Sequence, residues 1–389
     1  MRPIRPARRS RTIDGPPGSL WEPLDPTSQA VAVAVLRRGP IARADLARRL
    51  QLSTPSLTRI VRQLMDSGIV VELPPAQLAR TGRPSLPIAV DPDRAWFVGF
   101  KVVTHRVHAA VCDLSGAVQR TTSLPLPDTR PETVVDRVTQ MVLEQRAASP
   151  QIMGSGIALA AVVDDGRTVR SARFLGWGEV DLADRIETST GLPCVLDNDV
   201  RAFTVAEHWF GVGRGLSSFA VLTVGTGVGA GIVVHDELVA GSHGRSGMVG
   251  HLVVDPDGPP CYEDHRGCAF QVMGYAGLAD RFSEVLGRRV EFEQGLSLAA
   301  SEPGIEQVLR HASRCLGRLA GTVANLCDPE RILLSGEGIG WVVRDALQVG
   351  LDETRFDGVR QAEVLTQQID VFEWARGAAA GAIRRYVLD

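Results

Sequence analysis

The sequence predicts a mixed α/β protein that carries a small, mainly α domain at its N-terminus. The chain has 389 residues, more than one ordinary hydrophobic core accommodates, so two or three domains are expected. Three short helical patterns and a turn-rich hairpin pattern follow one another between residues 26 and 91. From residue 94 onward, strand-like and helix-like segments alternate, which is typical of an α/β architecture.

Charge is distributed unevenly along the chain. Residues 1–90 contain 14 Arg, no Lys and 6 acidic residues, a net charge of +8, whereas the rest of the chain carries −11. A basic head on an acidic body indicates that only the head meets a polyanion. Five of these arginines precede residue 12, so a solvated, disordered basic arm over residues 1–25 explains part of the excess equally well.

Composition argues against a membrane or secreted protein. No apolar run approaches the roughly 20 residues that a membrane helix needs. The basic N-terminus lacks the apolar segment of a secretory signal, and six scattered cysteines do not form a disulfide framework. We therefore expect a cytoplasmic protein with reduced thiols and no membrane partner.

Start and stop signals delimit three helices in the head. The first is expected to be capped by Thr27 and to stop at Gly39-Pro40, and the second covers residues 42–50. The third has Thr54 as its expected N-cap and Pro55 at its first helical position. Its apolar residues recur at i, i+3, i+4 and i+7, which predicts one buried face made of Leu57, Ile60, Val61 and Leu64.

Two β-rich segments, residues 69–73 and 86–90, then predict a hairpin wing. Helix, helix, short turn, helix and hairpin make a winged helix-turn-helix over residues 26–91, in which the third helix enters the major groove of double-stranded DNA. The exposed face of that helix has no acidic residue between Pro55 and Met65, which favours DNA over a protein-interaction role, the alternative for such domains. The expected DNA contacts are Pro55, Ser56, Thr58, Arg59, Arg62 and Gln63 on the helix and Arg80 and Arg83 near the wing tip.

The body begins with two β-rich runs over residues 96–113 and an amphipathic helix over 133–147. A buried strand is expected over residues 157–163, and Leu196 opens another. Residues 219–231 predict strand, glycine turn and strand. Such a turn lets backbone amides approach a phosphate closely, although glycines are equally common where two backbones pack.

The body resembles the ROK family, a name that joins repressors, open reading frames and kinases. The resemblance spans nearly the whole chain and is carried by motifs in the family's order: LGW at Leu175–Trp177, LPCVLDND at Leu192–Asp199, GTGVGAGIVV at Gly225–Val234, GH at Gly250-His251, the loop Cys261–Cys268 and DPERILLSGEG at Asp328–Gly338. It implies an actin-like, sugar-kinase-like pair of α/β lobes with a ligand cleft between them.

The resemblance also implies the domain plan and the partners. The first lobe would comprise residues 94–210 and the C-terminal helix 372–389, and the second lobe residues 211–371 with the dimerisation surface. Because the repressor branch of the family carries a winged helix, we expect a regulator, more often a repressor, that binds an inverted-repeat operator as a homodimer or dimer of dimers. A small-molecule effector, sugar-derived or less polar, would act on the body.

The nucleotide side of the cleft departs from the pattern of the family's kinases. Asp199 matches the catalytic aspartate, and Asn198 is retained beside it. Where the kinases carry an aspartate and two glycines in the first phosphate loop, residues 99–104 read GFKVVT, with Lys101, the single lysine of the chain, in place of the aspartate. A cation cannot recruit magnesium, so we expect no enzymatic activity. An active sugar kinase, and a body that serves only as a dimerisation scaffold, are the alternatives.

The sugar side of the cleft is altered as well. Three positions that are polar in the family, an Asn near LGW and two Glu around the GH and cysteine motifs, are apolar in this chain. An effector less polar than a simple hexose, or an empty structural cleft, is therefore expected, and core packing is the alternative role of the aromatic residues. The family's sugar-contacting positions correspond to Phe174, Asn198, Asp199, Met248, His251 and Phe270.

The family's structural zinc is held by one His and three Cys. This chain retains His251, Cys261 and Cys268, and Glu263 stands in place of the middle cysteine. Zinc accepts carboxylate oxygen, so the resemblance implies a His251, Cys261, Glu263, Cys268 site. Three ligands plus water, His265 as a substitute ligand, or two reduced thiols packed under a loop are the alternatives.

Overall fold

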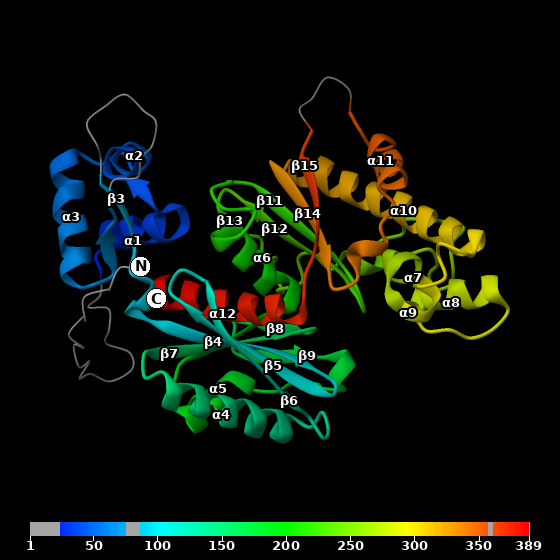
Figure 1. Ribbon diagram of the computed structural model, residues 1–389, viewed down its shortest axis with the longest axis horizontal. Helices are drawn as coiled ribbons and strands as arrows, with labels where there is room; N and C mark the ends of the chain where they lie inside the picture. Colours follow the sequence, from blue (N-terminus) through cyan, green and yellow to red (C-terminus); the bar gives the residue numbers. More distant parts are fainter. Residues whose placement is uncertain (1–23, 75–85, 357–360, 389) are drawn as a thin grey trace, which may run out of the picture.

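The structure, a computed structural model, describes residues 24–74, 86–356 and 361–388. It consists of a small N-terminal head and a body with two five-stranded sheets (Figure 1). The long C-terminal helix α12 (Val371–Leu388) lies across the first sheet, and the head lies beside its C-terminal end. None of the helices in the described ranges is long and apolar enough to cross a membrane.

The head has the predicted winged helix-turn-helix arrangement. Its helices are α1 (Pro26–Arg38), α2 (Arg43–Arg49) and α3 (Thr54–Asp66). Its strands β1 (Ile41–Ala42), β2 (Val70–Glu72) and β3 (Pro87–Val90) form an antiparallel sheet in the order β1-β3-β2. The buried face of α3 consists of the four predicted apolar residues, so the helical periodicity is confirmed.

Both predicted N-caps were placed too late in the chain. The carboxylate of Asp25 caps α1 and accepts from the amides of Thr27 and Ser28, at 3.0 and 3.1 Å. The hydroxyl of Ser53 caps α3 and accepts from the amide of Ser56 at 3.3 Å. In both helices a proline occupies one of the first two helical positions, where its missing N–H costs nothing, so the capping side chain precedes it.

The first sheet of the body has the order β10-β7-β4-β5-β6. Its strands are β4 (Trp96–Val103), β5 (Arg106–Asp113), β6 (Val118–Pro125), β7 (Ile152–Leu159) and β10 (Cys194–Asn198). Helices α4 (Pro131–Ala148) and α5 (Leu182–Thr190) cover one face, and α6 (Asp199–Phe210) and α12 cover the other. We call this part of the body the first lobe.

One predicted strand of the first lobe is divided in the structure. The expected strand over residues 157–163 is two strands, because β7 ends at Leu159 and the chain continues into the hairpin of β8 (Val162–Asp164) and β9 (Thr168–Ser171).

Helix α12 can lie on the sheet because Gly99 and Gly156 have no side chain: a Cβ on either residue would lie about 2 Å from a carbonyl oxygen of α12.

The second sheet has the order β13-β12-β11-β14-β15. Its strands are β11 (Phe219–Val224), β12 (Val228–Val234), β13 (Glu237–Leu238), β14 (Arg331–Gly336) and β15 (Glu363–Gln368). The helices that pack with it include α7 (Ala269–Met273), α8 (Tyr275–Leu286), α9 (Phe292–Leu296), α10 (Pro303–Cys327) and α11 (Arg344–Asp352). We call this part the second lobe, and Figure 1 shows it on the opposite side of α12 from the first sheet.

Candidate DNA interface, ligand cleft and metal centre

Helix α3 presents a polar face outward from the head. Arg59, Arg62 and Gln63 are exposed, and Ser56 and Thr58 are half-buried on the same helix. The first turn of α3 contains no acidic residue, and its last turn contains no basic residue. The positive charge of the helix therefore comes from the arginines in its middle. This face carries the groups that read base edges and phosphates in a major groove.

Several hydrogen bonds position these side chains. The Ser53 hydroxyl donates to the hydroxyl oxygen of Ser56 at 2.9 Å, and Thr58 donates to the carbonyl of Thr54 at 2.8 Å. The guanidinium of Arg59 donates to Oε1 of Gln63 at 3.4 Å. The Thr58 hydroxyl proton is therefore committed to the helix backbone, and its oxygen remains an acceptor. The predicted contacts Arg80 and Arg83 lie outside the described residues.

Asp199, one of the expected effector-binding residues, belongs to a buried ion pair that the sequence did not predict. The ammonium of Lys101, on β4, contacts Oδ2 of Asp199, the first residue of α6, and both residues are less than a tenth exposed. Lys101 Nζ also lies 5.0 Å from the ring centroid of Trp374 on α12. The carboxylate that would act as general base in a kinase is thus neutralised by a cation held between two helices and a strand.

The neighbouring Asn198 is engaged in the fold. Its Oδ1 accepts from the amides of Val200 and Arg201 at 3.0 and 3.3 Å, which caps α6, and its amide nitrogen donates to the carbonyl of Ala161 at 3.2 Å. Its side chain therefore has one free N–H to offer a ligand.

Tyr275, at the start of α8, packs against the glycine turn between β11 and β12, a contact that the sequence did not predict. Its amide donates to the carbonyl of Gly225, in the turn between β11 and β12, at 2.9 Å. A Cβ at Gly338 would lie 2.3 Å from the Tyr275 hydroxyl, and a Cβ at Gly225 would lie 3.7 Å from it. The phenol ring therefore fills the space between two glycine turns. Burial raises the pKa of Tyr275 to about 12, so the phenol remains neutral.

Two of the remaining predicted effector positions, His251 and Phe270, form an aromatic cluster with Tyr262. The rings of His251, Tyr262 and Phe270 lie 5.3 to 6.0 Å from one another. Arg173 stacks its guanidinium 4.0 Å from the Tyr262 ring centroid, which connects the first lobe to the second. Phe174 is 49% exposed, too exposed for the core-packing role that was its alternative, and Met248 is 60% exposed.

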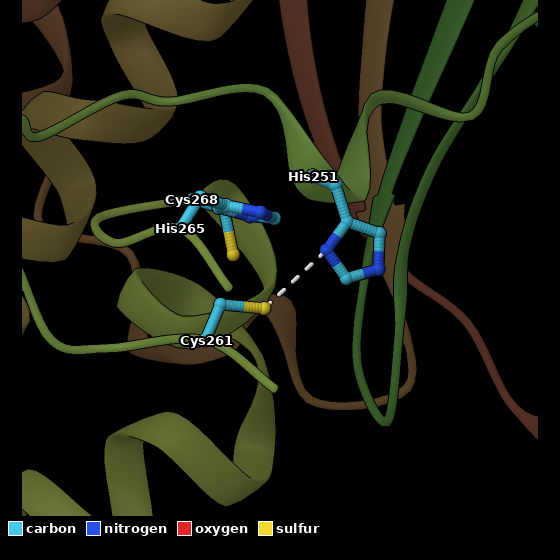
Figure 2. Close-up of side chains that lie close together, drawn as sticks. All are labelled: His251, Cys261, His265 and Cys268. Atoms are coloured by element: carbon cyan, nitrogen blue, oxygen red, sulfur yellow. Dashed lines mark hydrogen bonds between the residues drawn. The ribbon is translucent and has the colours of Figure 1, made fainter. Parts of the chain in front are cut away.

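Two histidines and two cysteines point toward one another in the second lobe (Figure 2). The ligand atoms of His251, Cys261, His265 and Cys268 all lie within 4.8 Å of one another. Nδ1 of His251 lies 3.5 Å from Sγ of Cys261, and Nε2 of His251 lies 3.1 Å from the hydroxyl of Tyr262. Two thiolates and two imidazoles are a ligand set that holds zinc tetrahedrally, so these residues fit a structural metal.

Glu263, the expected fourth ligand, lies outside this cluster in the structure. The Glu263 carboxylate points to the first lobe and accepts from Arg173 at 3.0 Å. His265, the substitute that the sequence left open, is the fourth residue of the cluster, and its Nδ1 contacts the Glu263 carbonyl at 3.1 Å. Nε2 of His265 is buried and has no hydrogen-bond partner in the described structure, so it is the ring nitrogen that is free to bind a metal.

The thiols outside this cluster are buried structural groups. Burial raises the pKa of Cys112 and of Cys194 to about 12 and that of Cys315 to about 11, so these side chains remain protonated and unreactive. Cys327 is half-buried, and burial raises its pKa as well.

Comparison with known proteins places this architecture among characterised proteins. The chain is 25% identical over 334 residues, 82% of each chain, to the DNA-binding transcriptional repressor Mlc of Escherichia coli K12. A solved ROK family transcriptional regulator, described as a homologue of that protein, superposes with a TM-score of 0.75 at 23% identity, covering 92% of this chain and 95% of its own. A ROK family glucokinase from Streptomyces griseus, solved with glucose and AMPPNP, superposes with a TM-score of 0.63 at 27% identity, covering 75% of this chain and all of its own.

The regulator superposes on 92% of this chain and the glucokinase on 75%, so the fold of the regulator matches more of this chain. The family model described as "ROK family" matches residues 98–364. This match spans more than half of the chain and contains most of both sheets, the Lys101–Asp199 pair and the His/Cys cluster. The chain belongs to the ROK family.

Proposed function

We propose that this protein is a sequence-specific DNA-binding transcriptional regulator whose kinase-like body senses an effector. The observation that carries the proposal is the exposed face of α3, where Arg59, Arg62 and Gln63 project from a winged helix-turn-helix. Such a helix reads the major groove, and arginines bind guanine edges or phosphates there. The relative named Mlc is a DNA-binding repressor, and we assign the same mode of action, repression, to this chain.

The body is assigned as a sensor because two features oppose phosphoryl transfer. A kinase needs a free carboxylate as base and an open pocket for nucleotide phosphates and magnesium. In this chain the ammonium of Lys101 neutralises Asp199, and the Tyr275 ring fills the space between the turns that contain Gly225 and Gly338. We infer that ATP is not a substrate and that the cleft between the lobes binds an effector only.

The chemistry of the cleft favours an effector that is less polar than a simple hexose. Phe174, Met248 and Phe270 stand where the family carries polar side chains, and the free hydrogen-bonding capacity of Asn198 is reduced by its capping role. The hydroxyl of Tyr262 is hydrogen-bonded to Nε2 of His251, so this nitrogen is already engaged and is not offered to an effector. An effector with an apolar or aromatic portion fits these surfaces better than a polyol.

We assign zinc to the cluster of His251, Cys261, His265 and Cys268, as a structural ion that fixes the loop carrying Tyr262. We also assign a homodimer that binds an inverted repeat, because two heads related by a twofold axis read two half-sites about 10 base pairs apart or a multiple of that distance. The metal would hold the aromatic side of the cleft in place and take no part in chemistry.

The test is selection of bound duplexes from a random-sequence pool by the full-length protein at physiological salt. We expect enrichment of one inverted-repeat motif, and no enrichment by the Arg59→Ala/Arg62→Ala double variant. The double variant Arg281→Ala/Arg344→Ala, which removes two exposed or half-exposed arginines from the second lobe, is the charge-matched control and should enrich the same motif. Recovery of a random pool by the wild-type protein would contradict the proposal.

A further inference from the structure

The head is attached to the first lobe along the length of α1. The side-chain amide of Gln29 donates to the carbonyl of Val387 at 3.2 Å, near the end of α12. Val31 and Val35 are fully buried in the same apolar cluster as Trp209 of α6 and Ile383 of α12. The cores of the head and the first lobe are therefore continuous, and α1 is anchored on that lobe.

The C-terminal end of α1 is also attached to the second lobe. Arg37 forms an ion pair with Asp236, in the turn between β12 and β13 of the second lobe. Arg38 donates to the carbonyl of Gly215 at 2.9 Å, and Arg214 donates to the carbonyl of Arg37 at 2.8 Å, in the segment that leads from α6 into β11. One helix of the head is thus bound to both lobes.

The strand that ends at this turn begins at the metal cluster. At the start of β12, Ala230 donates its amide to the carbonyl of Gly247 at 2.8 Å. A Cβ at Gly247 would lie 1.8 Å from the carbonyl oxygen of Ala230, and one at Gly250 would lie 2.8 Å from that of Val228. The short helix η3 (Val249–His251), which carries the metal-site histidine, therefore packs backbone to backbone on β12.

Strand β12 is held by hydrogen bonds along its whole length. It pairs with β11 at every residue from Val228 to Val233 and with β13 at Val233 and Val234. A β-strand rises about 3.4 Å per residue, so its seven residues span roughly 20 Å. Strand β12 therefore connects η3 at one end with the turn at Asp236, where Arg37 is bound, at the other.

We propose that β12 couples the ligand cleft to the head: a change at η3 moves the turn at Asp236, and the Arg37–Asp236 pair turns α1 against its anchorage on the first lobe. This regulation rests on the proposed function, because the head it reorients is the DNA-binding domain. Charges facing the Arg37–Asp236 pair come from Arg38 of α1, whose guanidinium lies 3.7 Å from Asp236, and from His208 of α6, whose Nε2 also lies 3.7 Å from it.

Hydrogen–deuterium exchange of the full-length protein, followed by mass spectrometry without DNA, tests this coupling. The cleft end is perturbed by Gly247→Ala, which must displace the backbone of β12, or by Val249→Ala, a milder change in η3. Asp236→Asn weakens the ion pair with Arg37 and so uncouples α1 from the turn between β12 and β13. Asp345→Asn, which weakens the Arg310–Asp345 pair between α10 and α11, is the matched control for loss of an ion pair.

We expect either cleft variant to change the exchange rate of α1 amides by roughly fivefold or more, the lower range for coupled sites. In the Asp236→Asn background the same cleft variant should change it less than twofold, whereas in the Asp345→Asn background the full effect should remain. Equal α1 exchange in the wild type and both cleft variants, or an undiminished effect with Asp236→Asn, would overturn the proposal. Because no DNA is present, this result is independent of whether the duplex selection succeeds.

Discussion

The ammonium of Lys101 pairs with the carboxylate of Asp199 inside the first lobe, and both charges are almost completely removed from water. The pair closes the position where a phosphoryl-transferring relative would keep a free base. It also joins β4 to the beginning of α6, next to Trp374 of α12. Its partners make it a structural element of the first lobe.

Removal of one partner of this pair should therefore destabilise the protein strongly. Lys101→Met leaves the Asp199 carboxylate buried without a counter-charge, which costs about 3–5 kcal/mol of the free energy of unfolding. Lys101→Met/Asp199→Asn removes both charges and should recover most of that loss. Urea denaturation measures both values. A double variant no more stable than Lys101→Met would show that the pair is not an energetic unit.

Metal analysis can distinguish the two candidate fourth ligands. Purified protein should contain about one equivalent of zinc. Cys268→Ser and His265→Ala should each weaken zinc binding by more than the roughly 10–100-fold that loss of an outer partner costs. Glu263→Gln should leave the zinc content unchanged, because that carboxylate binds Arg173. Loss of zinc from Glu263→Gln, with retention in His265→Ala, would restore the sequence-based ligand set.

Acid sensitivity should arise in part at the junction of head and body. Burial lowers the pKa of His208 below its ordinary value of 6.5, with Arg37 and Arg38 acting in the same direction and the Leu216 carbonyl and Asp236 opposing them. Below pH 6.5 the unfolded chain binds a proton at His208 that the folded chain resists, so the free energy of unfolding falls as the pH decreases.

His208→Gln removes this contribution. Its deficit in the free energy of unfolding relative to wild type, measured by urea denaturation, should be largest at pH 7.5 and smaller at pH 5. His108, whose pKa burial also lowers, is present in both proteins and cancels in the comparison. A deficit that stays constant between these pH values would mean that His208 titrates normally.

Simple sugars should bind the cleft poorly. Isothermal titration of glucose, N-acetylglucosamine and xylose against the wild-type protein should give no dissociation constant in the micromolar range, because apolar side chains stand at Phe174, Met248 and Phe270. Phe270→Glu, which restores one family carboxylate, should strengthen sugar binding. Micromolar binding of any of the three sugars by the wild type would refute the assignment of a less polar effector.

The sequence carried the local features of this protein and missed features that depend on the tertiary fold. The helical period of α3 and the two wing strands follow from neighbouring residues, so the head could be predicted from them. The partner of Lys101 lies 98 positions away, and nothing local indicates it. Tyr275 looked like an ordinary helix residue until the fold placed it between two glycine turns.

The metal loop shows the same limit at shorter range. Glu263 and His265 are two residues apart, and both are chemically acceptable zinc ligands. Asp264, with a φ of 55°, lies between them in the left-handed region, and this turn directs one side chain to the cluster and the other to Arg173. Ligand spacing could not decide between them, because the choice depends on the conformation of a single residue.

The central claim, that α3 reads DNA, is tested most directly by comparing the affinity of the protein for its selected duplex with that for a scrambled duplex at physiological salt. We predict a ratio of about 10³ or more. Arg59→Ala or Arg62→Ala should cost roughly 1–3 kcal/mol of binding free energy to the selected duplex if the arginine reads a base. Equal affinities for the two duplexes, or unchanged binding in both variants, would contradict the claim.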